Sequence, residues 1–105
     1  MLTDEERTAH LLATLGEEGG EVSQMVGKCL RFGLMDKHPK TGNIPNLELL
    51  AHEVNDLIGV AEMLGIYRDE MLVQDKKARV LKYMDYAERT LAKQKESGYV
   101  HPERD

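Results

Sequence analysis

Apolar residues recur at helical spacing along most of the chain. In the first third, steps of four and three residues connect Leu11, Leu15, Glu18, Val22, Met25 and Cys29. The same spacing later connects Leu49, Glu53, Asp56, Val60 and Met63. Residues spaced in this way lie on one face of a helix, and that face packs against a neighbouring element. The pattern predicts two packed helices whose apolar seams both contain carboxylates.

Capping and breaking residues set the expected bounds of three helices. Thr3 followed by Glu6 forms a capping box, and Asn46 and Asp69 are suited to cap two later helices. Glycines at 33, 65 and 98 are suited to end the three helices. The residues from 34 to 45 are rich in turn formers and predict a loop. The expected helices therefore span about 4–32, 46–64 and 69–97.

The glycine-rich stretch Gly16–Glu21 interrupts good helix formers, and each interior glycine costs about 1 kcal/mol against alanine. We nevertheless predict a helix here, because the seam stays in phase from Leu15 to Val22. The small residues would let a second helix or a ligand approach closely. A continuous helix of this length measures about 43 Å. We expect it to bend at the glycines or to extend across a partner subunit.

The chain shows no alternation of polar and apolar residues that would indicate strands. We predict an all-α fold with one domain at residues 1–98 and a C-terminal tail at 99–105. Its architecture is expected to be an antiparallel bundle of three main helices, completed by oligomerisation because 105 residues bury only a limited core. Four methionines are expected to fill gaps in this core: Met25, Met63, Met71 and Met84.

Composition narrows the classes of protein that fit. The net charge of −5 argues against binding a nucleic acid polymer, which requires basic surface. No apolar run is long enough to span a membrane, and the acidic N-terminus is unlike a signal peptide. The single cysteine, Cys29, excludes an intrachain disulfide. We expect a cytoplasmic protein.

The carboxylates in the seams carry the strongest functional signal. Glu18 and Glu21 are three residues apart, as are Glu53 and Asp56, so each pair lies one turn apart on a helix. Buried carboxylates lose hydration and repel one another, and a divalent cation resolves both problems. Ligands that are all oxygen favour Mg²⁺, with Mn²⁺ as a substitute. The alternative for any such cluster is an ordinary solvated helix face.

Cationic and polar residues near the clusters suggest a site for a phosphorylated ligand. Gln24, Lys28 and Arg31 continue the face of Glu21, with Lys28 about 10 Å along the helix axis. This spacing suits a polyphosphate that meets a metal at one end and cations at the other. The third helix offers a second candidate face with Lys76, Arg79, Tyr83 and Tyr86. Both groups have an alternative interpretation as surface residues.

The acidic motifs are similar to those of a known family. Glu17-Glu18-x-x-Glu21 followed by Glu53-x-x-Asp56 resembles the signature of MazG-like nucleoside triphosphate pyrophosphohydrolases. These belong to an all-α superfamily that includes dimeric dUTPases and phosphoribosyl-ATP pyrophosphohydrolases. The resemblance covers about residues 10–86 and looks closest to small single-domain members encoded by bacteriophages.

The resemblance implies hydrolysis of a (deoxy)nucleoside triphosphate to the monophosphate and pyrophosphate, in the cytoplasm of a bacterial or phage-infected cell. It implies that Glu18, Glu21, Glu53 and Asp56 bind Mg²⁺, and that Glu17 either supports these ligands without binding the metal or orients water. Glu17, Glu18 and Glu21 are thereby expected to be catalytic. Lys28 and Arg31 would stabilise the leaving pyrophosphate. The assembly would be a homodimer or homotetramer.

Two features depart from the family pattern: the loop makes the interval between the motifs long, and Gly19 and Gly20 leave few side chains near the metal. Two other functions stay open. One is a non-catalytic helical module for interaction or oligomerisation, with its acidic residues facing solvent or paired with cations. The other is a pyrophosphohydrolase for a different nucleotide, such as phosphoribosyl-ATP.

Overall fold

The computed structural model describes residues 1–96. Three long helices account for most of them: α1 (Asp4–Phe32), α2 (Asn46–Met63) and α3 (Glu70–Glu96). A short 3-10 helix, η1 (Pro39–Thr41), lies in the loop between α1 and α2. Within residues 1–96 the only extended pairing is a single bridge between Lys37 and Pro45. The prediction of an all-α fold is confirmed.

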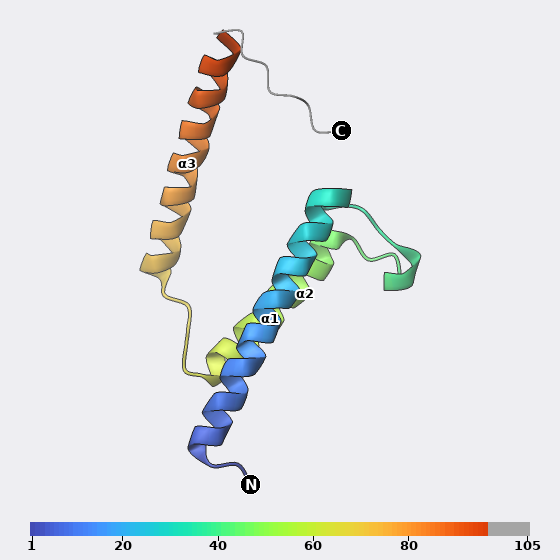
Figure 1. Ribbon diagram of the computed structural model, residues 1–105, viewed down its shortest axis with the longest axis vertical. Helices are drawn as coiled ribbons and strands as arrows, with labels where there is room; N and C mark the ends of the chain where they lie inside the picture. The colour runs from blue at the N-terminus through green and yellow to red at the C-terminus, as the bar shows by residue number, and fades with distance from the viewer. Residues whose placement is uncertain (97–105) are drawn as a thin grey trace. The chain divides into compact units, whose positions relative to one another are not determined.

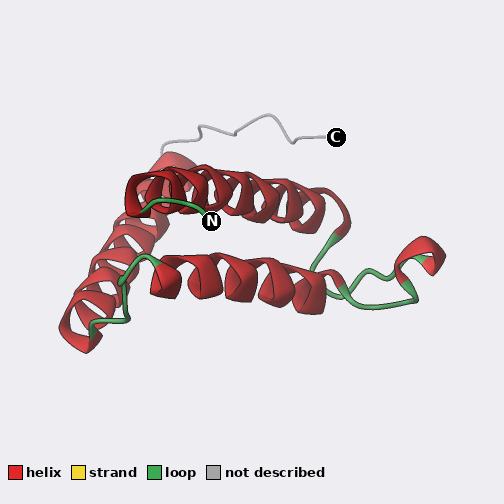
Figure 2. Ribbon diagram, turned by 90° about the horizontal axis from the view of Figure 1, so that it is seen from below, coloured by secondary structure: helices red, strands yellow, loops and turns green. Residues whose placement is uncertain are grey.

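Two compact units make up the chain, and each is described by itself. The first, Met1–Tyr67, contains α1 and α2, which lie side by side and run in opposite directions (Figures 1 and 2). The second begins at Arg68 and contains α3. The antiparallel pair of the expected bundle is therefore confirmed, whereas the packing of the third helix stays a prediction. No helix within residues 1–96 has both the length and the apolar character needed to cross a bilayer.

Helix α1 begins with the capping box expected from the sequence. The Thr3 hydroxyl accepts a hydrogen bond from the Glu6 backbone N–H, and the Glu6 carboxylate accepts one from the Thr3 N–H, each at 3.1 Å. The helix continues through Gly16–Glu21 and ends at Gly33, whose φ of 96° and ψ of 155° favour glycine. The prediction that the glycine-rich stretch is helical is confirmed.

The glycines of α1 do not serve as a contact surface for α2. A Cβ added at Gly16, Gly19 or Gly20 would meet no atom within 4 Å. The expected close approach of a second helix is therefore wrong for α2, and the surface beside the acidic cluster is open. The helix persists through this stretch because Leu15 and Val22, on either side of it, are both half-buried.

Alanine substitutions at two glycines of α1 should have opposite effects on stability. Gly20→Ala should raise the free energy of unfolding by about 1 kcal/mol, because alanine is the better helix former and meets open space. Gly33→Ala should lower it by about 1–3 kcal/mol, because the backbone there suits only glycine. Urea denaturation monitored by circular dichroism measures both. A loss of stability in Gly20→Ala would instead indicate that a second chain lies against this surface.

Burial along α1 follows the predicted seam. Leu11 and Met25 are the most enclosed apolar side chains, at 8% and 7% exposure, and the other seam positions are half-buried. On α2 the prediction is only partly right, because Asp56 and Met63 are exposed. The half-buried positions are instead taken by the following set: Leu49, Leu50, Glu53, Leu57, Val60, Ala61 and Leu64. Turning Leu57 inward removes apolar surface from water and leaves the Asp56 carboxylate hydrated at the margin.

The start of α2 differs from the prediction that the side chain of Asn46 caps it. Asn46 is instead the first residue of the helix and is buried, with its Nδ2 donating to the Gly33 carbonyl at 3.0 Å. The loop backbone does the capping: the N–H groups of Asn46 and Leu47 donate to the carbonyls of Asp36 and Leu34, at 3.0 and 2.8 Å. The 33–45 loop is thereby fixed to the beginning of α2.

The end of α2 and the start of α3 follow the predicted signals. Gly65 adopts a positive φ of 84°, and its N–H and that of Ile66 donate to the carbonyls of Glu62 and Ala61. This is the hydrogen-bond pattern of a Schellman motif. Asp69 caps α3, since its Oδ1 accepts from the Leu72 N–H at 3.2 Å. The expected end of α3 near residues 97 and 98 and the tail at 99–105 lie outside the described residues.

Much apolar surface remains exposed. Met25 is buried as predicted, but Met63, Met71 and Met84 are exposed, so their expected role in a core is wrong within each unit taken alone. Helix α2 carries a second seam at heptad-like spacing, hereafter the outer seam, which consists of Leu47, Ala51, Val54 and Ile58. Its large members are exposed, with 36% for Val54 and 47% for Ile58. Helices that are apolar on two sides are normally covered on both, and the exposed outer seam is consistent with a partner surface.

Candidate metal centre

Three carboxylates meet where α1 packs on α2. Glu18 comes from α1, and Glu53 and Asp56 come from α2, three residues apart. One carboxylate oxygen from each lies within 4.8 Å of the others. Glu18 and Glu53 are half-buried because both occupy inward positions of their helices, and Asp56 is exposed at the edge. The packing of α1 on α2 thus builds a carboxylate triad, and Glu18 rather than Glu17 faces inward, as the seam predicted.

The charges of the triad are uncompensated. Burial raises the pKa of Glu18 above its ordinary value, and the negative charges of Asp56, Glu53, Glu21 and Glu17 raise it further, in that order. Within residues 1–96 every ion pair involves an arginine of the second unit. No lysine or arginine of this part of the chain therefore forms an ion pair with the triad. Three close carboxylates without a counter-charge repel one another, and a bound cation would remove that repulsion.

The donor set fits a hard divalent cation. All three ligands are carboxylate oxygens, which suit Mg²⁺, Mn²⁺ and Ca²⁺ rather than metals that select imidazole or thiolate. Three protein ligands leave positions of an octahedral ion free for water or phosphate oxygens. Asp56 at the exposed edge keeps the site open to solvent. The arrangement can therefore hold a divalent cation whose remaining coordination positions face solvent.

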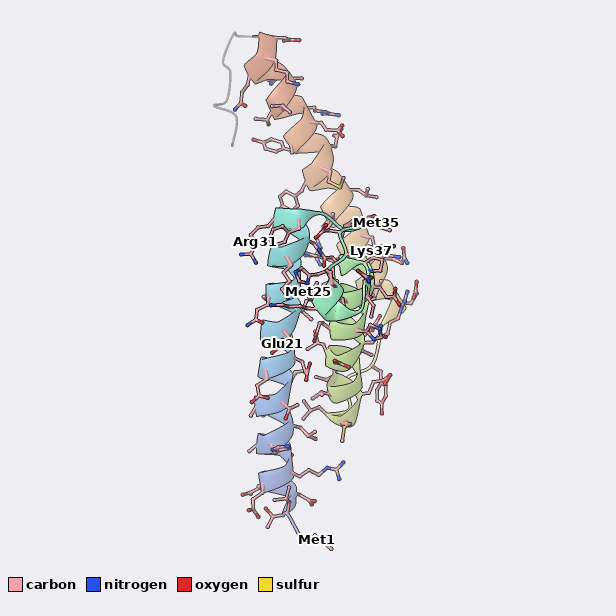
Figure 3. The ribbon with its side chains drawn as sticks, turned by 90° about the vertical axis from the view of Figure 1, so that its right-hand side faces the viewer. Met1, Glu21, Met25, Arg31, Met35 and Lys37 are labelled. Carbon is pink, nitrogen blue, oxygen red and sulfur yellow. The ribbon has the colours of Figure 1, made fainter. Side chains whose placement is uncertain are left out.

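The other two predicted acidic residues lie outside the triad. Glu17 and Glu21 are exposed on α1, and Figure 3 shows Glu21 one turn before Met25 along that helix. Both are near enough for their charges to raise the pKa of Glu18. The ligand role of Glu21 and the water-orienting role of Glu17 stay predictions.

The predicted phosphate-binding residues of α1 are all exposed. Gln24 lies on the surface. Arg31 places its guanidinium carbon 5.6 Å from the centre of the Phe32 ring. Lys28 borders a pocket of about 290 Å³ that is bounded by the end of α1, the 33–45 loop and the start of α2. Of these three residues, only Lys28 lines that pocket.

The predicted residues of α3 form a surface of the second unit. Lys76, Arg79 and Tyr83 are exposed, and the Arg79 Nε donates to the Asp75 carboxylate at 3.0 Å. Arg79 and Tyr83 border a shallow hollow along α3 with two further residues, Lys82 and Tyr86. Their proposed contact with substrate stays a prediction.

The pocket at the end of α1 also contains residues for which the sequence predicted no role in binding a ligand. His38 and Lys40 come from the loop, and Leu49 comes from the second turn of α2. One signal in the sequence could have indicated them. Residues 28–45 contain four lysines or arginines against the single acidic residue Asp36, although the chain as a whole is acidic.

Comparison with known proteins does not extend this picture. No protein-family model matches the chain. No curated protein and no solved structure matches it either. The chain is a small all-α protein with an acidic cluster, and its function has to be argued from that cluster.

Proposed function

We propose that the protein is a Mg²⁺-dependent nucleotide pyrophosphohydrolase that converts a (deoxy)nucleoside triphosphate to the monophosphate and pyrophosphate. The observation that carries the proposal is the carboxylate triad at the packing of α1 on α2. The resemblance of the Glu17–Glu21 and Glu53–Asp56 motifs to those of MazG-like enzymes supports the reaction class. The cation, when present, would supply positive charge against the phosphate oxygens and acidify a water molecule.

Each residue of the site has a distinct proposed task. Glu18, Glu53 and Asp56 hold the cation, with Glu21 as a further ligand. The exposed carboxylate of Glu17 orients the attacking water from the solvent side. Lys28 and Arg31 contact the departing phosphates, where their charge offsets the negative charge that develops as the anhydride bond breaks. Gln24 and the α3 residues Lys76, Arg79 and Tyr83 are proposed to contact other parts of the nucleotide.

The experiment that tests this function is a panel of (d)NTPs incubated with the protein and Mg²⁺. Pyrophosphate and orthophosphate are measured separately, because attack at the α-phosphorus releases only pyrophosphate. We expect pyrophosphate and the monophosphate in equal amounts. Release of orthophosphate alone, or no metal-dependent turnover of any nucleotide, would contradict the proposal. The second result would favour a non-catalytic interaction module, for which the exposed apolar side chains are the supporting observation.

We further propose that a second copy of the chain covers the outer seam of α2, which gives a homodimer or a homotetramer. Ile58→Lys should dissociate this assembly, because a buried lysine in an apolar interface loses its hydration. Size-exclusion chromatography with light scattering measures the mass. Glu48→Gln is the matched control: it changes the charge of α2 by the same amount at an exposed position off the seam. A wild-type protein that is monomeric at all concentrations would contradict the assembly.

A further inference from the structure

The pocket at the end of α1 is distinct from the carboxylate triad, although both lie in the α1–α2 unit. Phe32 and Leu49 supply apolar parts of its lining, whereas Lys28, His38 and Lys40 supply polar groups. Its volume of about 290 Å³ lies near the lower limit of small-molecule pockets. Figure 3 shows the region from the side, with Arg31 on α1 and Met35 and Lys37 in the loop next to the start of α2. This space is large enough for one group of a ligand but not for an entire nucleotide.

The charge of the pocket favours an anion. Lys28 and Lys40 both line it, and neither takes part in an ion pair within residues 1–96. Asp36 is the one acidic residue of the lining. The surrounding segment 28–45 carries a net positive charge between two acidic stretches of the chain. Two unpaired ammonium groups in an otherwise acidic unit attract a multiply charged anion.

His38 adds a directed hydrogen-bond donor. Its Nδ1 accepts a hydrogen bond from the Lys40 N–H at 3.0 Å, so the neutral ring carries its proton on Nε2. This bond also fixes the loop backbone between His38 and Lys40. The first N–H groups of α2, in contrast, are already bonded to carbonyls of the loop. An anion in this pocket would therefore have to be bound by side chains of α1 and the loop.

The pocket lies close to the triad along α2. Leu49 borders the pocket and Glu53 belongs to the triad, and these residues are four apart on one helix. Four residues rise about 6 Å, which is one turn. A polyphosphate can thus reach from a cation at the triad to the ammonium groups of the pocket. A nucleobase is less well matched, because the Arg31 guanidinium already lies over the Phe32 ring, with its central carbon 5.6 Å from the ring centre.

We propose that this pocket is a pyrophosphate subsite, in which Lys40 and His38 of the 33–45 loop join Lys28 to bind the two phosphate groups that leave the substrate. The inference deepens the proposed function and rests on it for the identity of the substrate. The binding of the anion itself does not depend on turnover. The long loop, which sets this chain apart from the family pattern, thereby has a function of its own.

The test uses inorganic pyrophosphate as the probe, titrated into the full-length metal-free protein by isothermal calorimetry at low ionic strength. Lys40→Gln should weaken binding by about tenfold or more, since it removes one charged hydrogen bond to the anion. Lys37→Gln is the matched control, because Lys37 is an exposed lysine of the same loop that does not line the pocket. It should change the affinity by less than about twofold. Thermal melts of both variants check that each is folded.

Several outcomes would overturn the inference: no pyrophosphate binding by the wild type, equal losses in Lys40→Gln and Lys37→Gln, or binding of a nucleoside in place of pyrophosphate. The failure of this inference can be told apart from failure of the proposed function. Pyrophosphate binding that depends on Lys40, in a protein that turns over no nucleotide, would support the subsite and contradict the enzyme. Turnover with an unchanged KM and unchanged product inhibition in Lys40→Gln would support the enzyme and contradict the subsite.

Discussion

Replacing Asp56 by asparagine should abolish metal-dependent nucleotide hydrolysis. Asp56 supplies one of the three carboxylates that lie within 4.8 Å of one another, and it forms the solvent-exposed edge of the triad. Asparagine keeps the size of the side chain but removes its negative charge, so a cation at the triad would exchange an anionic ligand for a weaker neutral one. Removing even an outer-shell partner of a metal site costs about 10- to 100-fold, and a direct ligand should cost more. We expect kcat/KM to fall by at least about a hundredfold, as measured by pyrophosphate release.

The control for this variant is Glu62→Gln, which removes a negative charge from an exposed position of the same helix outside the triad. It should keep the activity of the wild type within about twofold, since isolated surface charges contribute little. Circular dichroism should show equal helix content in both variants, because Asp56 and Glu62 are both exposed. Full activity in Asp56→Asn would show that Asp56 is not part of the site.

The second large effect is a change in stability on replacing Glu18. The replacement should stabilise the protein, whereas replacing a half-buried residue usually destabilises it. Glu18→Gln should stabilise the metal-free protein at neutral pH while it abolishes metal binding. Burial and four neighbouring carboxylates raise the pKa of Glu18, so its charged form destabilises the folded state. Glutamine is nearly isosteric and removes that repulsion. Thermal melts in the presence of a chelator should therefore give a higher midpoint for the variant than for the wild type.

The pH dependence of this difference follows from linkage. The pKa of Glu18 is higher in the folded than in the unfolded chain, so the folded state binds the proton more tightly. The wild type therefore loses stability as the pH rises from the unfolded-state pKa of Glu18 to its folded-state pKa. The advantage of Glu18→Gln should be largest above the raised pKa. It should vanish below the ordinary range of glutamate, about 4.3, where both states of the wild type are protonated. Glu62→Gln serves again as the control, and a destabilised Glu18→Gln at neutral pH would contradict the account.

Added Mg²⁺ should reverse the order of the two proteins. A ligand that binds only the folded state stabilises it by mass action, by about 1.4 kcal/mol for each tenfold rise in concentration above Kd. The wild type should gain this stability and Glu18→Gln should not. The charge of Glu18 would thus destabilise the metal-free protein and help to stabilise the metal-bound one.

The first helix could be predicted almost completely from the sequence, because its signals are local. Thr3, Glu6 and Gly33 mark its ends, and the seam from Leu11 to Cys29 stays in phase across three glycines. The same phase placed Glu18 inward and Glu17 outward. On α2 the periodicity alone could not choose between neighbouring apolar stripes. The structure turns Leu57 inward and leaves Asp56 at the margin, since a carboxylate retains water there at lower cost.

Other features could not be read from the sequence because they depend on contacts between distant parts of the chain. Asparagine commonly caps helices, yet the side-chain amide of Asn46 donates a hydrogen bond to the carbonyl of Gly33, thirteen residues earlier. Backbone carbonyls of the loop accept hydrogen bonds from the first N–H groups of α2 instead, and their positions depend on how residues 33–45 fold back onto that helix. The pocket that joins Lys28 to His38 and Lys40 arises from that same path. Of this pocket, the sequence showed only the excess of basic residues between 28 and 45.

The most direct test of the central claim is a titration of the metal-free protein with Mn²⁺, followed by electron paramagnetic resonance and by competition with Mg²⁺. We predict saturable binding by the wild type that Mg²⁺ displaces, and its loss in Glu18→Gln, Glu53→Gln and Asp56→Asn, while Glu62→Gln binds as the wild type does. The three carboxylates from two helices would then act as one site. Absence of saturable binding at millimolar metal, or equal binding by the wild type and the triad variants, would contradict it.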